Sequence, residues 1–325
     1  MIVLGVESTA HTFGVAIIKE KQVLANEKDS YTTEKGGIIP YKAADHHVEI
    51  CDKLLNQALK KAKIKLENVD LISFSQGPGM GHCLRIGAFF ARSLSSMLNK
   101  PLIGVNHCIA HLSIGFMLTN VKDPVLLYLS GANTQVIAYE GGKYRIFGET
   151  LDNGIGNFLD SFARFLDLGF PGGPKIEQLA KKSKTFIELP YNVKGMDVSF
   201  GGLLTNLKQK YKNGFKKEDL CYSIQETIFA MMIETAERAL AHCNKKELIL
   251  GGGVACNKRL QEMAKKMCKE RNTKCFILPN EFNVDNAAMI AWQGLIQYKV
   301  NKRTKIKESI ILPNQRTDDV KVNWI

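Results

Sequence analysis

The chain has 325 residues, 45% of them hydrophobic, and a formal net charge of +12 at pH 7. This composition excludes a largely disordered chain, and the length favours two domains or two fused lobes. No stretch reaches the roughly 18 consecutive apolar residues of a membrane span, and the first residues lack a secretory signal. We therefore expect a cytoplasmic protein with no membrane partner. The positive charge fits a polyanionic partner such as RNA or a solvated lysine-rich surface, and charge alone does not decide between them.

The first half alternates strand-like and helix-like segments. Three apolar runs separated by turns predict a three-stranded meander, and a helix, a strand, a glycine-rich loop, a second helix and another strand follow it. The predicted meander, first helix, strand, glycine-rich loop and last strand are residues 2–30, 41–63, 71–75, 76–81 and 102–105.

The second half repeats this plan about 120 residues later, which indicates a duplication. Its meander, long helix, strand, glycine-rich loop and last strand are residues 125–152, 219–244, 248–250, 251–257 and 275–278. Such alternation predicts two α/β lobes, residues 1–122 and 123–325, each with a mixed sheet covered by helices. Ligands of α/β lobes bind where strands end and helices begin, so we expect the glycine-rich loops of both halves to line a cleft between the lobes.

A histidine pair, His107 and His111, is spaced four residues apart in the segment NHCIAH. On a helix this spacing places both imidazoles on one face, where they can bind one ion. Under the duplication, Asp285 in NVDNAAM occupies the equivalent position and would approach the same cleft. Two histidines and a carboxylate suit iron or zinc. A metallopeptidase of the HExxH type is disfavoured because Cys108 stands where that motif needs glutamate.

Small-residue turns suggest a nucleotide site. Residues 130–134 join two strands, and residues 170–174 and 251–257 precede predicted helices. Their backbone N–H groups could surround phosphate oxygens, although a plain hairpin turn also explains the first. None matches a P-loop or a Rossmann fingerprint. Asp160 could accept ribose hydroxyls or orient a water, whereas Asp152 is expected to offset a helix dipole, and Glu177 has the same ambiguity.

Six segments in order resemble one family. The duplicated meanders resemble the actin, Hsp70 and sugar-kinase superfamily, which implies a duplicated two-lobe α/β fold with mixed sheets and an interlobe cleft. The whole set resembles the tRNA threonylcarbamoyltransferase family in its archaeal and eukaryotic KEOPS branch. The segments are GVESTAHT, NHCIAH, YLSGANTQV, GFPGGP, GGGVACN and VDNAAMIAW, between Gly5 and Trp292.

The resemblance implies an enzyme that moves the threonylcarbamoyl group from threonylcarbamoyl-AMP to the adenosine beside the anticodon of tRNAs that read codons starting with A. It implies one divalent metal, iron or zinc, with the ligands His107, His111, Tyr128 and Asp285. The implied nucleotide contacts are Tyr128, Leu129, Ser130, Gly131, Ala132, Asp160, Gly173, Glu177 and Asn257. The implied partners are tRNA, a kinase-like ATPase that is separate or fused in a longer chain, and dimerising and tRNA-binding KEOPS subunits.

Two residues depart from the family pattern. Ala132 stands where a second glycine is common, which matters only if that position needs a positive φ. Ser8 stands where archaeal relatives often have glycine, and His11 in the same loop receives no role. The alternative functions are a metallopeptidase and a noncatalytic ATP-dependent nucleic-acid-binding protein; a small-molecule kinase of the superfamily would have no use for the histidine pair.

Overall fold

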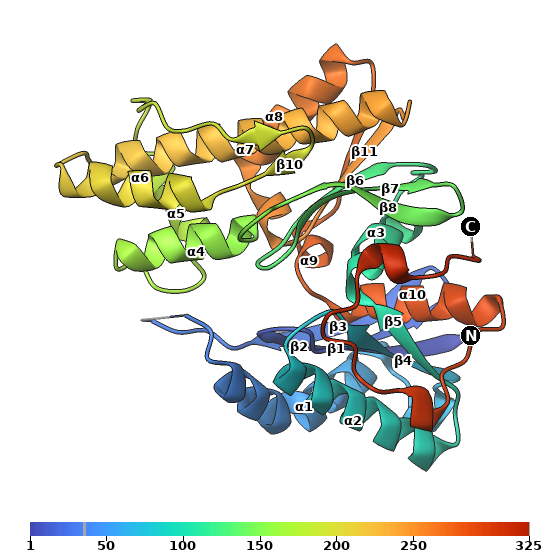
Figure 1. Cartoon of the computed structure of the whole chain (residues 1–325). Coiled ribbons are helices and arrows are strands. Elements are labelled where there is room, and N and C mark those ends of the chain that lie inside the picture. Colours follow the sequence, from blue (N-terminus) through green and yellow to red (C-terminus); the bar gives the residue numbers. More distant parts are fainter. Residues whose placement is uncertain (35–36, 325) are drawn as a thin grey trace.

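Two five-stranded mixed sheets organise the protein, whose computed structural model describes residues 1–34 and 37–324 (Figure 1). The first sheet has the order β3-β2-β1-β4-β5 and the second β12-β11-β6-β7-β8. The strands of the first sheet are β1 Ile2–Glu7, β2 Thr12–Lys19, β3 Gln22–Ser30, β4 Leu71–Gly77 and β5 Leu102–Asn106. The strands of the second are β6 Val125–Leu129, β7 Thr134–Glu140, β8 Lys143–Glu149, β11 Glu247–Gly251 and β12 Lys274–Ile277.

The two sheets share one topology. In each, three strands form an antiparallel meander. The first meander strand, β1 or β6, also pairs in parallel with β4 or β11, which in turn pairs in parallel with β5 or β12. This arrangement confirms the predicted meanders and the duplicated two-lobe α/β fold. Strands β1 and β6 lie at the centre of their sheets and are buried almost throughout, which explains why they read as continuous apolar runs.

Helices pack against both sheets. Their bounds are α1 Pro40–Ala62, α2 Gly81–Leu98, α3 His107–Leu118, α4 Ile155–Phe165, α5 Gly173–Ala180, α6 Gly201–Lys212, α7 Lys217–His242, α8 Lys258–Glu270, α9 Asn280–Asn283 and α10 Ala287–Lys299. Some of them, such as α4 and α5, contribute residues to the lining of the cleft. A two-stranded hairpin is formed by β9 Val193–Lys194 and β10 Asp197–Val198. None of the helices in the described part of the chain is both long and apolar enough to cross a membrane.

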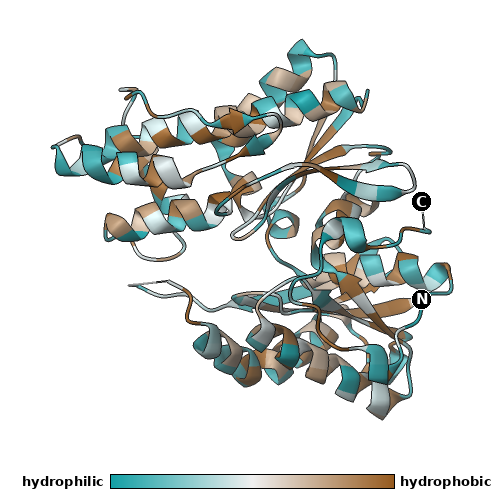
Figure 2. Ribbon diagram, in the orientation of Figure 1, coloured by the Kyte–Doolittle hydropathy of each residue, from teal (hydrophilic) through white to brown (hydrophobic). Residues whose placement is uncertain are grey.

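Helices α3 and α10 each pack against the sheet of the other half. Gly115 of α3 lies so close to Ile249 of β11 that an added Cβ would come within 2.2 Å of its Cδ1. Similarly, a Cβ at Gly5 of β1 would lie 2.3 Å from the backbone oxygen of Ala287 in α10. The two helices belong to one apolar cluster that includes residues of both sheets. In Figure 2, much of the strands of both sheets is coloured as hydrophobic. This exchange brings the start of α3 and the start of α10 together between the sheets.

Candidate metal centre and nucleotide cleft

The two histidines and Asp285 converge where α3 and α10 begin. The side chain of Asn106 accepts a hydrogen bond from the Ile109 N–H and caps α3, so His107 is the first helical residue. Asn286 caps α10 in the same way, which places Asp285 directly before that helix.

The potential ligand atoms of these three side chains lie close together. The Nε2 atoms of His107 and His111 lie 3.5 and 3.3 Å from the Oδ1 atom of Asp285. All three potential ligand atoms lie within 4.8 Å of one another. The structure thus brings together residues that are 174 positions apart in sequence.

Glu7 holds His107 from the side opposite the cleft, a role that the sequence analysis missed. Its buried Oε2 atom lies 3.0 Å from the His107 Nδ1 atom, and its Oε1 atom accepts hydrogen bonds from the N–H and hydroxyl of Thr9. If Nδ1–H donates to Glu7, the Nε2 lone pair points toward Asp285, as ligation requires. The only signal in the sequence was an acidic residue at the end of a buried strand.

The charged side chains of this group shift one another's pKa values. Burial lowers the pKa of His107, but the charge of Glu7 and the hydrogen bonds with Asp285 and Glu7 raise it well above its ordinary value. Burial opposes ionisation of Asp285 as well, yet hydrogen bonds with both histidines hold the pKa of Asp285 well below its ordinary value. Together these shifts favour a proton on His107 beside a charged Asp285, and a metal ion bound to the His107 Nε2 atom would displace that proton.

Tyr128, the fourth ligand that the resemblance implied, lies beside His111. It is fully buried in β6, and its ring centroid lies 5.0 Å from that of His111. Its hydroxyl has no hydrogen-bond partner among the described residues. A buried hydroxyl without a partner is costly unless a ligand satisfies it. Two imidazole nitrogens, a carboxylate and this hydroxyl make a donor set that fits a divalent transition metal.

A cavity of about 990 Å³ opens beside the metal group. The first half contributes Gly79 and Met80 to its lining, and the second contributes Gly253 and Asn257, so both glycine-rich loops line it as predicted. Of the predicted nucleotide contacts, Tyr128, Ser130, Gly131, Ala132, Asp160, Gly173, Glu177 and Asn257 line this cavity. Leu129 is not among the lining residues, because its side chain is buried in the core of the second half.

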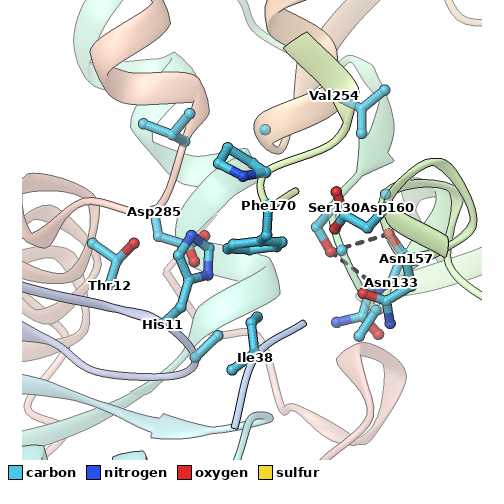
Figure 3. A pocket seen from close by; sticks show the side chains of 18 of the residues that line it. His11, Thr12, Ile38, Ser130, Asn133, Asn157, Asp160, Phe170, Val254 and Asp285 are labelled. Carbon is cyan, nitrogen blue, oxygen red and sulfur yellow. Dashed lines mark hydrogen bonds between the residues drawn. The ribbon is translucent and has the colours of Figure 1, made fainter. Parts of the chain in front are cut away.

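Phe170 separates two sides of the cleft. Figure 3 shows Asp285 and His11 on one side of its ring, and Ser130, Asn133 and Asp160 on the other. The ring centroids of His11 and Phe170 lie 5.3 Å apart in an edge-on arrangement. We call the side with Asp285 the metal side of the cleft and the side with Ser130 and Asp160 its nucleotide side.

Backbone contacts shape the loop at Ser130. The Ser130 N–H donates to the Asn133 oxygen, and the Asn133 N–H donates to the Ser130 hydroxyl, so the turn closes on itself. Glycines at the start of α4 allow the helix to lie close to this loop. A Cβ at Gly154 would lie 2.3 Å from the Gly131 oxygen, and one at Gly156 would lie 2.7 Å from the Gly131 Cα. Ala132 is not among the residues with positive φ, so its departure from the family pattern introduces no strain.

Other predicted nucleotide contacts also serve the fold. Asp160 accepts a hydrogen bond from the Gly172 N–H at 2.7 Å, and burial raises its pKa. Asn257 caps α8 by accepting from two backbone N–H groups. Glu177 lies 3.1 Å from the ammonium of Lys181, and Gly173 has open space around its α-carbon.

Asp152 stabilises a helix, as expected, but not its nearest one. Its carboxylate accepts hydrogen bonds from the N–H groups of Phe200 and Gly201 at the start of α6, rather than capping α4. Hydrogen bonds from this helix start and from Ser199 outweigh burial and lower the pKa of Asp152 to about 2. The correct helix was not evident from sequence because it starts 49 residues later.

Two similar lobes, each with a five-stranded mixed sheet and a glycine-rich loop at a shared cleft, define a duplicated two-lobe α/β fold. The structure resembles that of full-length HypF in the phosphate- and nucleotide-bound form, with a TM-score of 0.64 and 12% identity over 93% of this chain and 46% of that one. At this identity the likeness concerns the fold alone.

Closer relatives define the family. Residues 22–292 match the sequence model of TsaD, described as tRNA N6-adenosine threonylcarbamoyltransferase. A Thermococcus kodakarensis protein with that name is 56% identical over 325 residues, covering all of both chains. The chain is 53% identical to a Methanocaldococcus jannaschii protein called probable bifunctional tRNA threonylcarbamoyladenosine biosynthesis protein, over all of this chain and 61% of that one. The chain belongs to the tRNA N6-adenosine threonylcarbamoyltransferase family.

Proposed function

We propose that the chain transfers the threonylcarbamoyl group from threonylcarbamoyl-AMP to the N6 amine of the adenosine beside the anticodon, in tRNAs that read codons starting with A. The amine nitrogen forms a bond with the carbamoyl carbon, and the bond from that carbon to the phosphate oxygen breaks. AMP leaves with the electron pair of that bond, and the amine loses one proton. The protein is accordingly an acyltransferase.

The observation that carries this proposal is that one cavity is lined both by the loop at Ser130 and by His107 and Asp285 of the metal group. An acyl adenylate is already activated, so the enzyme needs no nucleophilic side chain. It must hold the donor and the amine together and stabilise the oxyanion that develops. The loop at Ser130, with Asp160, is suited to the adenosine part, which leaves the acyl group on the Asp285 side of Phe170.

We infer that His107, His111, Tyr128 and Asp285 hold one divalent metal ion, iron or zinc. The unpartnered hydroxyl of Tyr128 and the close approach of the potential ligand atoms of His107, His111 and Asp285, all within 4.8 Å of one another, support this set. When bound, the ion supplies a Lewis acid for a carbonyl or phosphoryl oxygen. Glu7 orients His107 for this role. The predicted nucleotide contacts, from Tyr128 through Ala132 with Asp160, Gly173, Glu177 and Asn257, remain part of the proposal, Leu129 through its backbone.

We further propose that the chain is the catalytic subunit of a cytoplasmic KEOPS complex, with tRNA, a kinase-like ATPase, a dimerising subunit and a tRNA-binding subunit as partners. Relatives named bifunctional extend beyond the length of this chain, which supports a link to a second activity. The net charge of +12 supports affinity for tRNA phosphates. Residues 1–122 and 123–325 would act as two lobes that close on the donor, with α3 and α10 between them.

The alternative functions have no comparable support. In a metallopeptidase of the HExxH type, the residue after the first histidine acts as a base, but Cys108 is 1% exposed and its thiol pKa is raised by burial. Glu7, the nearby carboxylate, contacts the Nδ1 side of His107, away from the cleft. A noncatalytic ATP-dependent nucleic-acid-binding protein would not need the His–His–Asp group.

Reconstitution tests the proposed function. The protein is incubated with threonylcarbamoyl-AMP, tRNA and its partner subunits, and the digested tRNA is searched for threonylcarbamoyladenosine by mass spectrometry. We expect the modified nucleoside. Its absence, with intact tRNA and partners known to be active, would contradict the proposal. Metal analysis of protein purified without air distinguishes iron from zinc.

A further inference from the structure

We propose that the ammonium group of Lys28 binds an anionic oxygen of a substrate at the edge of the metal centre. This inference rests on the proposed function, since it assigns a further substrate contact to the same cleft. Lys28 belongs neither to the predicted metal ligands nor to the predicted nucleotide contacts.

Lys28 reaches from the first half of the chain to the segment that carries Asp285. It lies on β3 and lines the cleft. Its ammonium donates hydrogen bonds to the backbone oxygens of Glu281 and Asp285, at 3.2 and 3.4 Å. These two contacts hold the charged group beside the metal centre and leave a third N–H available to a ligand in the cleft.

The charge of Lys28 lacks an ionic partner within the described part of the chain, where no carboxylate lies within 4.0 Å of it. The carboxylates of Asp285 and Glu281 attract it over a longer distance. That of Asp285, however, is already engaged by His107 and His111.

Two other partly buried lysines have partners within the chain. The ammonium of Lys245 lies 2.5 Å from Asp123 and 3.2 Å from Glu140. The ammonium of Lys302 lies 5.8 Å from the centre of the Trp324 ring. Because a buried charge is costly unless paired, the missing partner of Lys28 is expected to come from a ligand in the cleft.

Both substrates carry suitable anions. The donor has a threonine carboxylate and a phosphate, and tRNA has phosphodiesters. If the adenosine of the donor lies near Ser130, its acyl end points past Phe170 toward Asp285 (Figure 3). The Lys28 ammonium, which contacts the Asp285 backbone, then lies near that end. The geometry favours an anionic group of the donor, and the experiment below separates it from a tRNA phosphate.

The test compares Lys28→Met, which keeps an unbranched side chain of similar length and removes the charge, with Lys28→Arg, which keeps the charge. Lys53→Met is the matched control, because Lys53 is exposed on α1 and does not line the cleft. The measurements are kcat, the KM values for threonylcarbamoyl-AMP and for tRNA at two salt concentrations, and metal content. Calorimetry adds the affinity for a nonhydrolysable threonylcarbamoyl adenylate analogue, with the carboxylate intact or reduced to an alcohol.

We expect Lys28→Met to raise one KM about tenfold or more while metal content stays unchanged, since a hydrogen bond to a charged group is lost. Lys28→Arg should retain most of the affinity, and Lys53→Met should match the native protein. A higher KM for the donor, with weaker analogue binding, assigns the anion to the donor. If Lys28→Met binds the carboxylate and alcohol analogues equally well, whereas the native protein prefers the carboxylate, the anion bound by Lys28 is the threonine carboxylate. A higher KM for tRNA with a weaker salt dependence assigns the anion to a tRNA phosphate.

Unchanged KM values and analogue affinity in Lys28→Met would overturn the inference. So would a loss of metal as the only defect, because Lys28 would then merely hold the Asp285 segment. Failure of the proposed function looks different: the native protein itself would form no modified nucleoside. The calorimetric comparison remains informative in that case because it requires neither tRNA nor turnover.

Discussion

The metal side and the nucleotide side of the cleft are built on opposite principles. On the metal side, buried side chains from three distant segments converge, and each holds the next in place: Glu7 contacts His107, and both histidines contact Asp285. On the nucleotide side, the loop at Ser130 closes on itself and rests on glycines of α4. The metal side therefore depends on particular side-chain atoms, whereas the nucleotide side depends on the path of the backbone.

The largest effect should come from removing a ligand. His111→Ala should abolish both metal binding and product, a loss of at least about 100-fold, because three donors remain where the ion needs four. Metal analysis and nucleoside mass spectrometry measure the two losses. His82→Ala, at an exposed position of α2, is the control. Full activity of metal-free His111→Ala would show that the metal has no part in the reaction.

A smaller effect is expected at Glu7, which contacts the proposed ligand His107 and is not itself a proposed ligand. Glu7→Gln keeps the shape but removes the charge that holds His107, and metal affinity should fall by about 10- to 100-fold. Competition with a chelator measures this affinity. Glu27→Gln, which removes an ion pair with Lys61 on the surface, is the control and should leave the metal affinity unchanged. Equal affinities of Glu7→Gln and the native protein would mean that Glu7 does not support the metal group.

The nucleotide side should respond to a backbone clash and leave the metal side intact. In Gly156→Ala, the added methyl group would lie 2.7 Å from the Gly131 Cα and displace the loop. We expect KM for threonylcarbamoyl-AMP to rise about tenfold with unchanged metal content. Gly202→Ala is a matched control, since Gly202 is also the second residue of a helix and has open space around it. Loss of metal in Gly156→Ala would mean that the two sides are not independent.

The smallest effect is expected at Asp152, which accepts hydrogen bonds from the start of α6. Asp152→Ala should lower the free energy of unfolding by about 1 kcal/mol at pH 7, because the start of α6 loses its acceptor. The pKa of Asp152 is lowered to about 2, so its contribution is complete above the ordinary carboxyl pKa of 3.8 and is lost as the pH falls toward 2. Urea unfolding at several pH values should show the difference between the two proteins narrowing below about pH 4. A constant difference would indicate that packing, not charge, is responsible.

Much of the fold could be predicted from sequence because its signals are local. Both meanders, the helix at 41–63 and the long helix near 219–244 follow from apolar periodicity and turn residues, and their observed bounds agree to within a few residues. The duplication then suggested that Asp285 faces the histidine pair. Glu7 and Lys28 were missed, because a single acidic or basic residue in a strand has no distinctive spacing.

The sequence by itself determined the strands and helices of each half, the shared face of His107 and His111, and the family. Periodicity and capping act over a few residues, so they are legible in a linear chain. Only the tertiary structure decided that α10 packs on β1, that Glu7 lies behind His107, and that Lys28 reaches the Asp285 segment. These contacts depend on how closely α3 and α10 pack against the two sheets. That packing is determined by the complementary shapes of residues distant in sequence, such as Gly5 and Ala287.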